Sequence, residues 1–254
     1  MTLRIATWNI FFGNDLATIL HTIKTHEDFK NLDIFAIQEA SIHDGVEDAK
    51  RIAAAFGAQY DYYQVTSHMY KGIVQANAIV WNTKKVTVIQ KHNIDLPFAT
   101  DVRLGSGEKI LKHFIPSGKR KSLVIEGIIA RKSFRLYAAH FDVIGFQQRT
   151  AQMACILEDD EKRKQVDFSC ILGDLNTFAF FKRPTWINLK ELAKRYGYRD
   201  ITTHITWTFQ RQRIHFKQKL DAILLKEADN IKYVCWSTNI AGSDHIPLFV
   251  QIEL

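Results

Sequence analysis

The sequence contains little cysteine, and what it has is poorly placed for cross-linking or zinc binding. Its three cysteines in 254 residues, Cys155, Cys170 and Cys235, are odd in number, widely spaced and set among apolar neighbours. Such an arrangement fits neither a disulfide framework nor a zinc site, and it favours a reducing compartment. We therefore expect a cytoplasmic protein.

The chain also lacks any segment that would divide it into domains. No stretch is rich in proline, serine and glycine, and there is no internal repeat or low-complexity segment. Hydrophobic residues make up 46% and charged residues 24%, which are globular values. The longest irregular stretch runs from Leu96 to Lys121. We therefore predict a single domain that spans residues 1–254.

Long apolar runs are absent as well. The N-terminus begins Met-Thr-Leu-Arg and runs directly into a strand-like segment, without the basic region and apolar run of a secretory signal. No other run approaches the length that a bilayer-spanning helix needs. These absences predict a soluble protein with no integral membrane segment, and we expect a monomer.

Positive charge is in excess, with 34 lysines and arginines against 27 acidic residues and a net charge of +7. This excess favours acidic partners such as nucleic acid, anionic lipid head groups or phosphorylated small molecules. Cations interleaved with aromatics suit single-stranded nucleic acid and also a lipid surface, whereas the structural alternative is a solvated loop above core aromatics. Two stretches are basic: Arg103, Lys109, Lys112, Lys119, Arg120 and Lys121 in the first, and Lys182 and Arg183 with Phe180, Phe181 and Trp186 in the second.

Apolar periodicity predicts that strands and helices alternate at both ends of the chain. Residues 3–8 and 33–37 form strand-like runs, and a helical stripe from Leu16 to Ile23 follows an Asn14/Asp15 cap. A second helix is expected over 44–56, before Gly57. Consecutive strands in the middle indicate antiparallel pairing and helix-linked strands indicate crossovers, which predicts a mixed α/β layered domain. The remaining expected elements are strands at 60–65, 76–81, 86–89, 122–130, 134–140, 168–172, 205–209, 220–225 and 248–252, and helices at 147–162 and 185–196.

Polar residues stand at the ends of several predicted strands. Because a strand end is rigid and opens onto the rim of the sheet, side chains from distant positions can converge there. Each also has a structural alternative: Asn9 can simply end a strand, Glu39 can cap a helix, Asp174 with Asn176 can form a turn, and His140 can be a core histidine. The full set is Asn9, Glu39, His140, Asp174, Asn176, Asp221, Asp244 and His245.

Six segments that contain these residues resemble, in order, the signature blocks of the endonuclease/exonuclease/phosphatase (deoxyribonuclease I-like) superfamily. The resemblance covers residues 7 to 248, and the GDLN and SDH elements are its most specific parts. It implies an α/β four-layer sandwich, in which two mixed β-sheets pack face to face with helices outside. The segments are TWNI (Thr7–Ile10), IQEA (Ile37–Ala40), AAHFD (Ala138–Asp142), ILGDLNT (Ile171–Thr177), LDAILL (Leu220–Leu225) and SDHIPL (Ser243–Leu248).

The chemistry that this set would perform is the hydrolysis of a phosphate ester. Such a reaction needs charge neutralisation at the phosphoryl oxygens, an activated water in line and stabilisation of the departing oxygen. Hard oxygen ligands suit Mg²⁺ or Mn²⁺, and four carboxylates near one phosphate would repel it without a cation. The resemblance implies that Glu39 is the principal metal ligand, with Asn9 and Asp244.

The resemblance also implies roles for the remaining residues. His245, oriented by Asp221, would be a near-neutral base, and His140 would be an imidazolium clamp or proton donor. Asp174 and Asn176 would lie beside the scissile phosphate, with a division of labour that the sequence leaves open.

Three functions remain open at this stage: a nuclease of DNA or RNA, a phosphatase or phosphodiesterase of lipids or small phosphoesters, and a binding module without catalysis. The intact set of polar residues disfavours the third. The apurinic-site endonuclease branch has a tyrosine where His140 stands, which disfavours a repair role. A deoxyribonuclease I type pairing would need a glutamate near His140, whereas Gln75 to Asn82 offers only amides, and Asn77 matches the sphingomyelinase-like branch. The basic charge, taken together with the aromatic and basic segment at 180–186, favours the nuclease.

Overall fold

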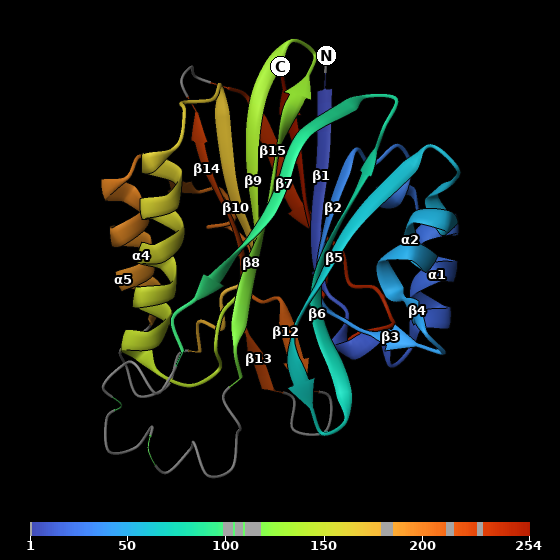
Figure 1. The fold of residues 1–254 in the computed structure, drawn as a ribbon, viewed down its shortest axis with the longest axis horizontal. Helices are drawn as coiled ribbons and strands as arrows, with labels where there is room; N and C mark the ends of the chain where they lie inside the picture. The colour runs from blue at the N-terminus through green and yellow to red at the C-terminus, as the bar shows by residue number, and fades with distance from the viewer. Residues whose placement is uncertain are drawn as a thin grey trace.

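The computed structural model describes residues 2–98, 104, 109, 118–178, 185–211, 216–227 and 231–254, and of residues 185 and 186 it describes the backbone alone. All statements below concern this part of the chain. It contains two six-stranded mixed β-sheets that pack face to face (Figure 1).

The first sheet joins both ends of the chain to its N-terminal third. Within it β1 pairs parallel with β2 and antiparallel with β16, so the first and last strands are neighbours. In spatial order its strands are β15 (Tyr233–Ser237), β16 (Leu248–Glu253), β1 (Thr2–Asn9), β2 (Ile34–Ala40), β6 (Ile73–Asn82) and β5 (Tyr60–Tyr70).

The second sheet is built from the middle and the C-terminal third of the chain. Here β9 and β10 are parallel and their other neighbours are antiparallel. In spatial order its strands are β11 (Arg199–Asp200), β14 (Asp221–Glu227), β10 (Phe168–Asp174), β9 (Lys132–His140), β8 (Arg120–Ile129) and β7 (Val86–Leu96). Two small hairpins stand apart from the sheets, β3 (Ile42–His43) with β4 (Val46–Glu47) and β12 (Phe209–Arg211) with β13 (Phe216–Gln218).

Helices cover the outer face of each sheet (Figure 1). The first sheet carries α1 (Leu16–Thr25) and α2 (Asp48–Phe56), and the second carries α4 (Phe146–Lys162) and α5 (Thr185–Arg195). Two short 3-10 helices, η1 (Phe11–Gly13) and η2 (Glu27–Phe29), lie on either side of α1 in sequence. The predicted four-layer α/β sandwich is confirmed.

Three buried apolar clusters fill the spaces between the four layers. One lies between the sheets, one beneath α1 and α2, and one beneath α4 and α5. Strand β1 contributes to two of them, with Leu3 and Ile5 facing the other sheet and Ala6 and Trp8 facing the helices. A strand that is buried on both faces has a nearly continuous apolar sequence, as β1 has.

Most predicted elements are present, and the departures have local causes. The helix expected over 44–56 begins at Asp48, because Asp44 and Gly45, with φ of 53° and 72°, form the turn between β3 and β4. The strand expected at 205–209 begins only at Phe209. Strand β15 was not predicted. The expected Asn14/Asp15 cap is confirmed for Asp15, whose carboxylate accepts a hydrogen bond from the backbone nitrogen of Thr18.

No helix in the described ranges combines the length and the apolar character that crossing a bilayer requires.

Candidate active site

The predicted site residues meet at one edge of the sandwich because of strand direction. β1 and β2 are parallel, β9 and β10 are parallel, and the four strands end at this edge, where the antiparallel β14 begins (Figure 1). Asp174 at the end of β10 is the register partner of His140 on one side and of Asp221 on the other. Strand pairing alone therefore aligns His140, Asp174 and Asp221 side by side on three neighbouring strands.

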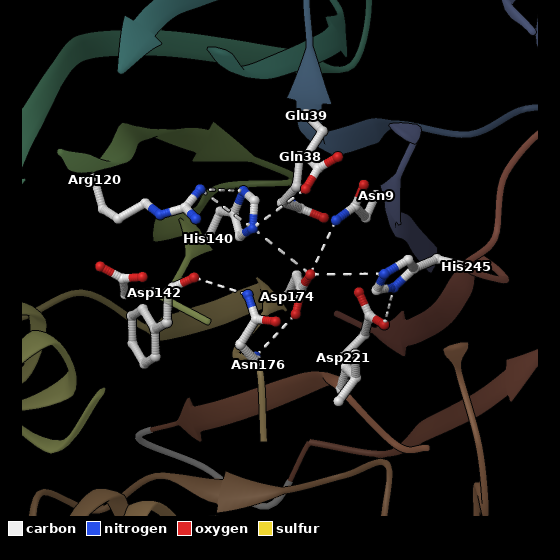
Figure 2. A network of polar contacts seen from close by, with 12 residues as sticks. Asn9, Gln38, Glu39, Arg120, His140, Asp142, Asp174, Asn176, Asp221 and His245 are labelled. Atoms are coloured by element: carbon white, nitrogen blue, oxygen red, sulfur yellow. Dashed lines mark hydrogen bonds and ion pairs between the residues drawn. The ribbon is translucent and has the colours of Figure 1, made fainter. Parts of the chain in front are cut away.

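Asp174 is the centre of the polar network (Figure 2). Its Oδ2 accepts a hydrogen bond of 2.9 Å from Asn9 Nδ2, and its Oδ1 accepts one of 2.8 Å from the backbone nitrogen of Asn176. The same Oδ2 lies 3.7 Å from His140 Nε2 and 3.8 Å from His245 Nε2. Burial, together with the charge of Asp221, raises the pKa of Asp174 to about 6.

His245 and Asp221 form a buried pair. His245 Nδ1 lies 2.7 Å from Asp221 Oδ2, and the backbone nitrogen of Asp221 donates to the hydroxyl of Thr208. Burial alone would lower the pKa of His245, but the charges of Asp221, Asp174 and Asp244 raise it to about 10. This environment favours the protonated ring, whereas the sequence predicted a near-neutral base at this position.

Glu39 stands on an irregularity in β2. The pairing of β2 with β6 shifts register between Ile37 and Ala40, and Glu39 has a φ of 53°. The bulge turns its carboxylate toward His140 Nε2, at 3.7 Å, and leaves the side chain 15% exposed. Burial, with the charges of Asp174 and Asp244, raises the pKa of Glu39 to about 7 against the opposing effect of His245.

The remaining predicted residues border this network. The side-chain amide of Asn176 donates to the carbonyl of Phe141 at 2.8 Å, which ties the turn after β10 to the end of β9. Asp244 lies near enough to Glu39 for their charges to interact, and burial raises its pKa. The structure thus brings together the whole predicted set.

Arg120 is a site residue that the sequence analysis placed elsewhere. It was assigned to a basic loop, but it is the first residue of β8, is 5% exposed and reaches His140 (Figure 2). Its Nη1 donates to Gln75 Oε1 at 2.9 Å and lies 3.2 Å and 3.4 Å from the two ring nitrogens of His140. Since a guanidinium only donates hydrogen bonds, the ring must accept one and stay neutral.

The pKa of His140 agrees with this contact. Burial and the charge of Arg120 hold it well below its usual value. The imidazolium expected at this position is therefore replaced by a neutral imidazole beside a permanent cation. No sequence signal separated Arg120 from the lysines around it.

The other basic residues of the two stretches do not form a single described surface. Lys121 pairs with Asp95, and His68 Nδ1 donates a hydrogen bond of 2.9 Å to the backbone carbonyl of Lys119. Arg103, Lys112, Phe180, Phe181, Lys182, Arg183 and the side chain of Trp186 lie outside the described residues.

Gly173 holds Asp174 in place, and no other residue fits there. Its φ is 135°, and a Cβ added to it would lie 2.0 Å from the carbonyl oxygen of Ala139 in the neighbouring strand. We expect Gly173→Ala to lower the free energy of unfolding by about 2–5 kcal/mol, from backbone strain and overpacking together. Gly72→Ala is the control, because Gly72 also has a positive φ but has open space around it. Denaturant unfolding in which both variants lose the same stability would contradict this account.

The residues of the site fit a divalent cation. Within the described residues the Glu39 carboxylate has no hydrogen-bond donor, and Asp221 Oδ1 is buried without a partner. Unpaired carboxylate oxygens in a buried site are the donors that hard cations take. A second ligand group, Asp174, Asp221 and His245, has its ligand atoms within 4.8 Å of one another. Its imidazole already shares a hydrogen bond with Asp221, so Glu39 is the better anchor.

A sequence model described as the Endonuclease/Exonuclease/phosphatase family matches residues 6–245. A search of curated proteins finds no match.

Three solved structures illustrate the structural likeness. A family protein from Bacteroides vulgatus has a TM-score of 0.72 at 17% identity, with 100% of this chain and 99% of that chain covered. D. rerio TDP2 complexed with single strand DNA product gives 0.71 at 14%, with 100% and 99% covered. A Bacteroides thetaiotaomicron mannosyl-6-phosphatase gives 0.67 at 16%, with 99% and 100% covered. At these identities the likeness shows the shared fold, and together with the sequence match it shows that the chain belongs to the Endonuclease/Exonuclease/phosphatase family.

Proposed function

We propose that this protein is a divalent-metal-dependent phosphoesterase that cleaves phosphodiester bonds of nucleic acid. One observation carries the phosphoesterase part. The carboxylates of Glu39, Asp174 and Asp221, the ring of His245 and the buried guanidinium of Arg120 converge at one edge of the sandwich (Figure 2), and Asp244 lies near enough to Glu39 for their charges to interact. Such a cluster of opposed charges suits the binding and hydrolysis of a phosphate ester.

Glu39 would hold Mg²⁺ or Mn²⁺, with Asn9 and Asp244 as its neighbours in the site. The bound ion would neutralise charge on a phosphoryl oxygen. Asn9 already serves a second purpose, because its amide group donates to Asp174 Oδ2 and accepts from the backbone nitrogen of Phe11. It therefore fixes the Asp174 carboxylate relative to the Glu39 side of the site.

The other residues divide the handling of protons and charge. His245, held by Asp221, would donate its Nε2 hydrogen to a phosphoryl oxygen, and Asp174 would orient the attacking water and accept its proton. Neutral His140 would donate a further hydrogen bond to the phosphate. Asn176 would keep the Asp174 carboxylate in place through its backbone nitrogen, which donates to Oδ1.

Aromatic side chains with nearby cations on two sides of the site favour nucleic acid as the substrate. Phe11, 42% exposed, follows the Asn9 strand, and Lys71 lies over the ring of Tyr70. On the other side Lys217 Nζ lies 3.9 Å from the ring centre of Trp207, and Phe209 packs on His245. Rings beside cations bind successive bases and phosphates of a single strand. The TDP2 structure of the same fold holds single strand DNA product, which supports this choice.

A phosphatase or phosphodiesterase of small esters or of phosphorylated lipids is the second candidate. The mannosyl-6-phosphatase of the same fold supports it. The sequence argument for it from Asn77 is weaker in the structure, because the Asn77 side chain donates to the carbonyl of Lys121 and links β6 to β8.

The decisive test is a substrate panel of single- and double-stranded DNA, RNA, phosphoinositides and sugar phosphates, each with Mg²⁺, Mn²⁺ or a chelator. We expect cleavage of single-stranded polymer that the chelator abolishes. We also expect this cleavage to weaken by about 10-fold or more when salt rises from 50 to 200 mM, because each neutralised phosphate releases counterions. Turnover of lipid or sugar phosphates alone would select the second candidate. No turnover of any substrate would contradict both.

A further inference from the structure

Two strained backbone segments adjoin Asn9 and Glu39 in the candidate site. Phe11 and Phe12 follow the strand that ends at Asn9, and their φ angles are 48° and 57°. In the bulge of β2, Glu39 itself has a φ of 53°. Such left-handed values are unfavourable for residues with bulky side chains, and they persist only where the surrounding structure holds them. Other groups of the chain must therefore hold both segments in place.

The buried carboxylate of Asp48, outside the candidate site, contacts both segments. Asp48 is the first residue of α2 and is 0% exposed, and its Oδ2 accepts a hydrogen bond of 2.7 Å from the backbone nitrogen of Ser41. The backbone nitrogen of Asp48 donates in return to the carbonyl of Ser41 at 3.0 Å. Gly13 packs on the same carboxylate, since a Cβ added to Gly13 would lie 2.6 Å from Asp48 Oδ2. Asp48 therefore links the segment after β1 to the segment after β2.

His43 adds a second link between Asp48 and the turn after β1. Its Nε2 lies 3.0 Å from the backbone carbonyl of Phe12, and because a carbonyl only accepts, this nitrogen carries the hydrogen. The same nitrogen lies 3.7 Å from Asp48 Oδ1. The carbonyl of His43 accepts a hydrogen bond of 2.8 Å from Arg51 Nη2. Since Arg51 and Asp48 both belong to α2, the helix fixes the histidine as well as the carboxylate.

Both segments are connected to predicted metal ligands. The backbone nitrogen of Phe11 donates to Asn9 Oδ1 at 3.0 Å, and Asn9 Nδ2 donates to Asp174 Oδ2 at 2.9 Å. A shift of the turn after β1 would therefore move the Asn9 amide and weaken its hold on Asp174. Ser41 stands two residues after Glu39, so a shift of Ser41 would alter the bulge that directs the Glu39 carboxylate.

We propose that Asp48, together with His43, is a positioning residue that holds Asn9 and Glu39 in place to bind a divalent cation. It acts through the backbone at the ends of β1 and β2. This assignment rests on the proposed function, in which Asn9 and Glu39 belong to the metal site. Groups that orient metal ligands from behind typically change metal affinity by about 10- to 100-fold when they are removed.

The test measures Mn²⁺ affinity by electron paramagnetic resonance in Asp48→Ala, Asp48→Asn and His43→Ala. We expect Asp48→Ala to raise the Kd by about 10- to 100-fold and His43→Ala to raise it by about 10-fold. Asp48→Asn keeps an oxygen that can accept from Ser41, so its Kd should lie between those of the wild type and Asp48→Ala. If Asp48→Ala does not fold, His43→Ala decides, because the His43 side chain is 35% exposed.

Asp33→Ala is the matched control, because Asp33 is an equally buried aspartate at the opposite end of β2. Its carboxylate accepts from the backbone nitrogen of Arg4 at 2.8 Å and pairs with Lys85 at 2.8 Å. We expect Asp33→Ala to lower the Tm as Asp48→Ala does and to leave Mn²⁺ affinity unchanged. In a wild type that binds Mn²⁺, unchanged affinity in Asp48→Ala and His43→Ala, or an equal loss in Asp33→Ala, would overturn the proposal.

Hydrogen exchange without metal separates this proposal from the proposed function. Backbone amides in residues 11–14 should exchange faster in Asp48→Ala and His43→Ala than in the wild type, because the turn after β1 would open locally. Asp33→Ala should leave their exchange unchanged. Faster exchange supports the positioning role even if the wild type hydrolyses nothing and binds no Mn²⁺. Unchanged exchange in both variants would overturn the role of Asp48 and His43 and leave the proposed function standing.

Discussion

Replacement of Glu39 by glutamine is expected to lower phosphoesterase activity by roughly 10³-fold, because the bound ion would supply several kcal/mol of charge stabilisation. The substitution keeps the size of the side chain and removes the charge that no donor in the described residues satisfies. In the presence of a chelator the variant should be at least as stable as the wild type, since burial disfavours the charged carboxylate. The measurements are steady-state rates, Mn²⁺ binding by electron paramagnetic resonance, and thermal melting.

Glu158→Gln is the matched control for Glu39→Gln. Glu158 is exposed on α4, where an ion pair of 3.9 Å joins it to Lys162, and its loss should change neither Mn²⁺ binding nor rate. If Glu39→Gln bound Mn²⁺ as tightly as the wild type, Glu39 would not be a metal ligand. The group formed by Asp174, Asp221 and His245 would then be the place to look for the ion.

Replacement of His245 by glutamine is expected to lower the rate by about 10²- to 10⁴-fold, the usual effect of removing a proton-handling residue. The reason lies in its two ring nitrogens, one bound to Asp221 at 2.7 Å and the other turned toward Asp174. Asp221→Asn should cost less, because it weakens the orientation of the imidazole without removing it. Single-turnover kinetics measure both losses.

The His245 and Asp221 substitutions should not be additive. Because the two residues act as a unit, the double variant should be at most a few-fold slower than His245→Gln alone. His21→Gln, on the exposed face of α1, is the control. Losses that multiply in the double variant would show that Asp221 acts on the substrate independently of His245.

The fold could be predicted from the sequence because its central strands are buried on both faces. Runs such as those of β1 and β10 are apolar throughout, and their polar ends mark the edge at which they stop. Asn9, His140 and Asp174 were found in this way, since each directly ends a strand. Short elements were the ones misplaced, because they depend on partners far away in sequence.

Two of these elements show what local sequence cannot give. β15 carries Cys235 and the exposed Val234, without clear alternation, and it exists because β16 offers it an edge to pair with. Near Thr208, the side-chain hydroxyl accepts hydrogen bonds from the backbone nitrogens of Leu220 and Asp221, and the backbone of Thr208 bonds to Gln218 and Ile246, partners that lie far away in sequence.

The pKa values of the site residues could not be predicted from the sequence either. The sequence pattern placed both histidines in the candidate site, but their charge states depend on burial and on neighbours brought together by the two sheets. Burial and the charge of Arg120 lower the pKa of His140, whereas the charges of Asp221, Asp174 and Asp244 raise the pKa of His245. In the sequence His140 is 20 residues from Arg120, and His245 is 24 residues from Asp221.

The contact between the two sheets has a consequence for how this protein can vary. The first sheet brings Asn9 and Glu39 to the site and the second brings His140, Asp174 and Asp221. Neither sheet has a complete site. The packing of the apolar cluster between the two sheets therefore sets the distances between the site residues of one sheet and those of the other. A core substitution that slides one sheet over the other would silence the enzyme while leaving it folded. Selection for activity is then also selection for the side chains of a core that no substrate ever touches.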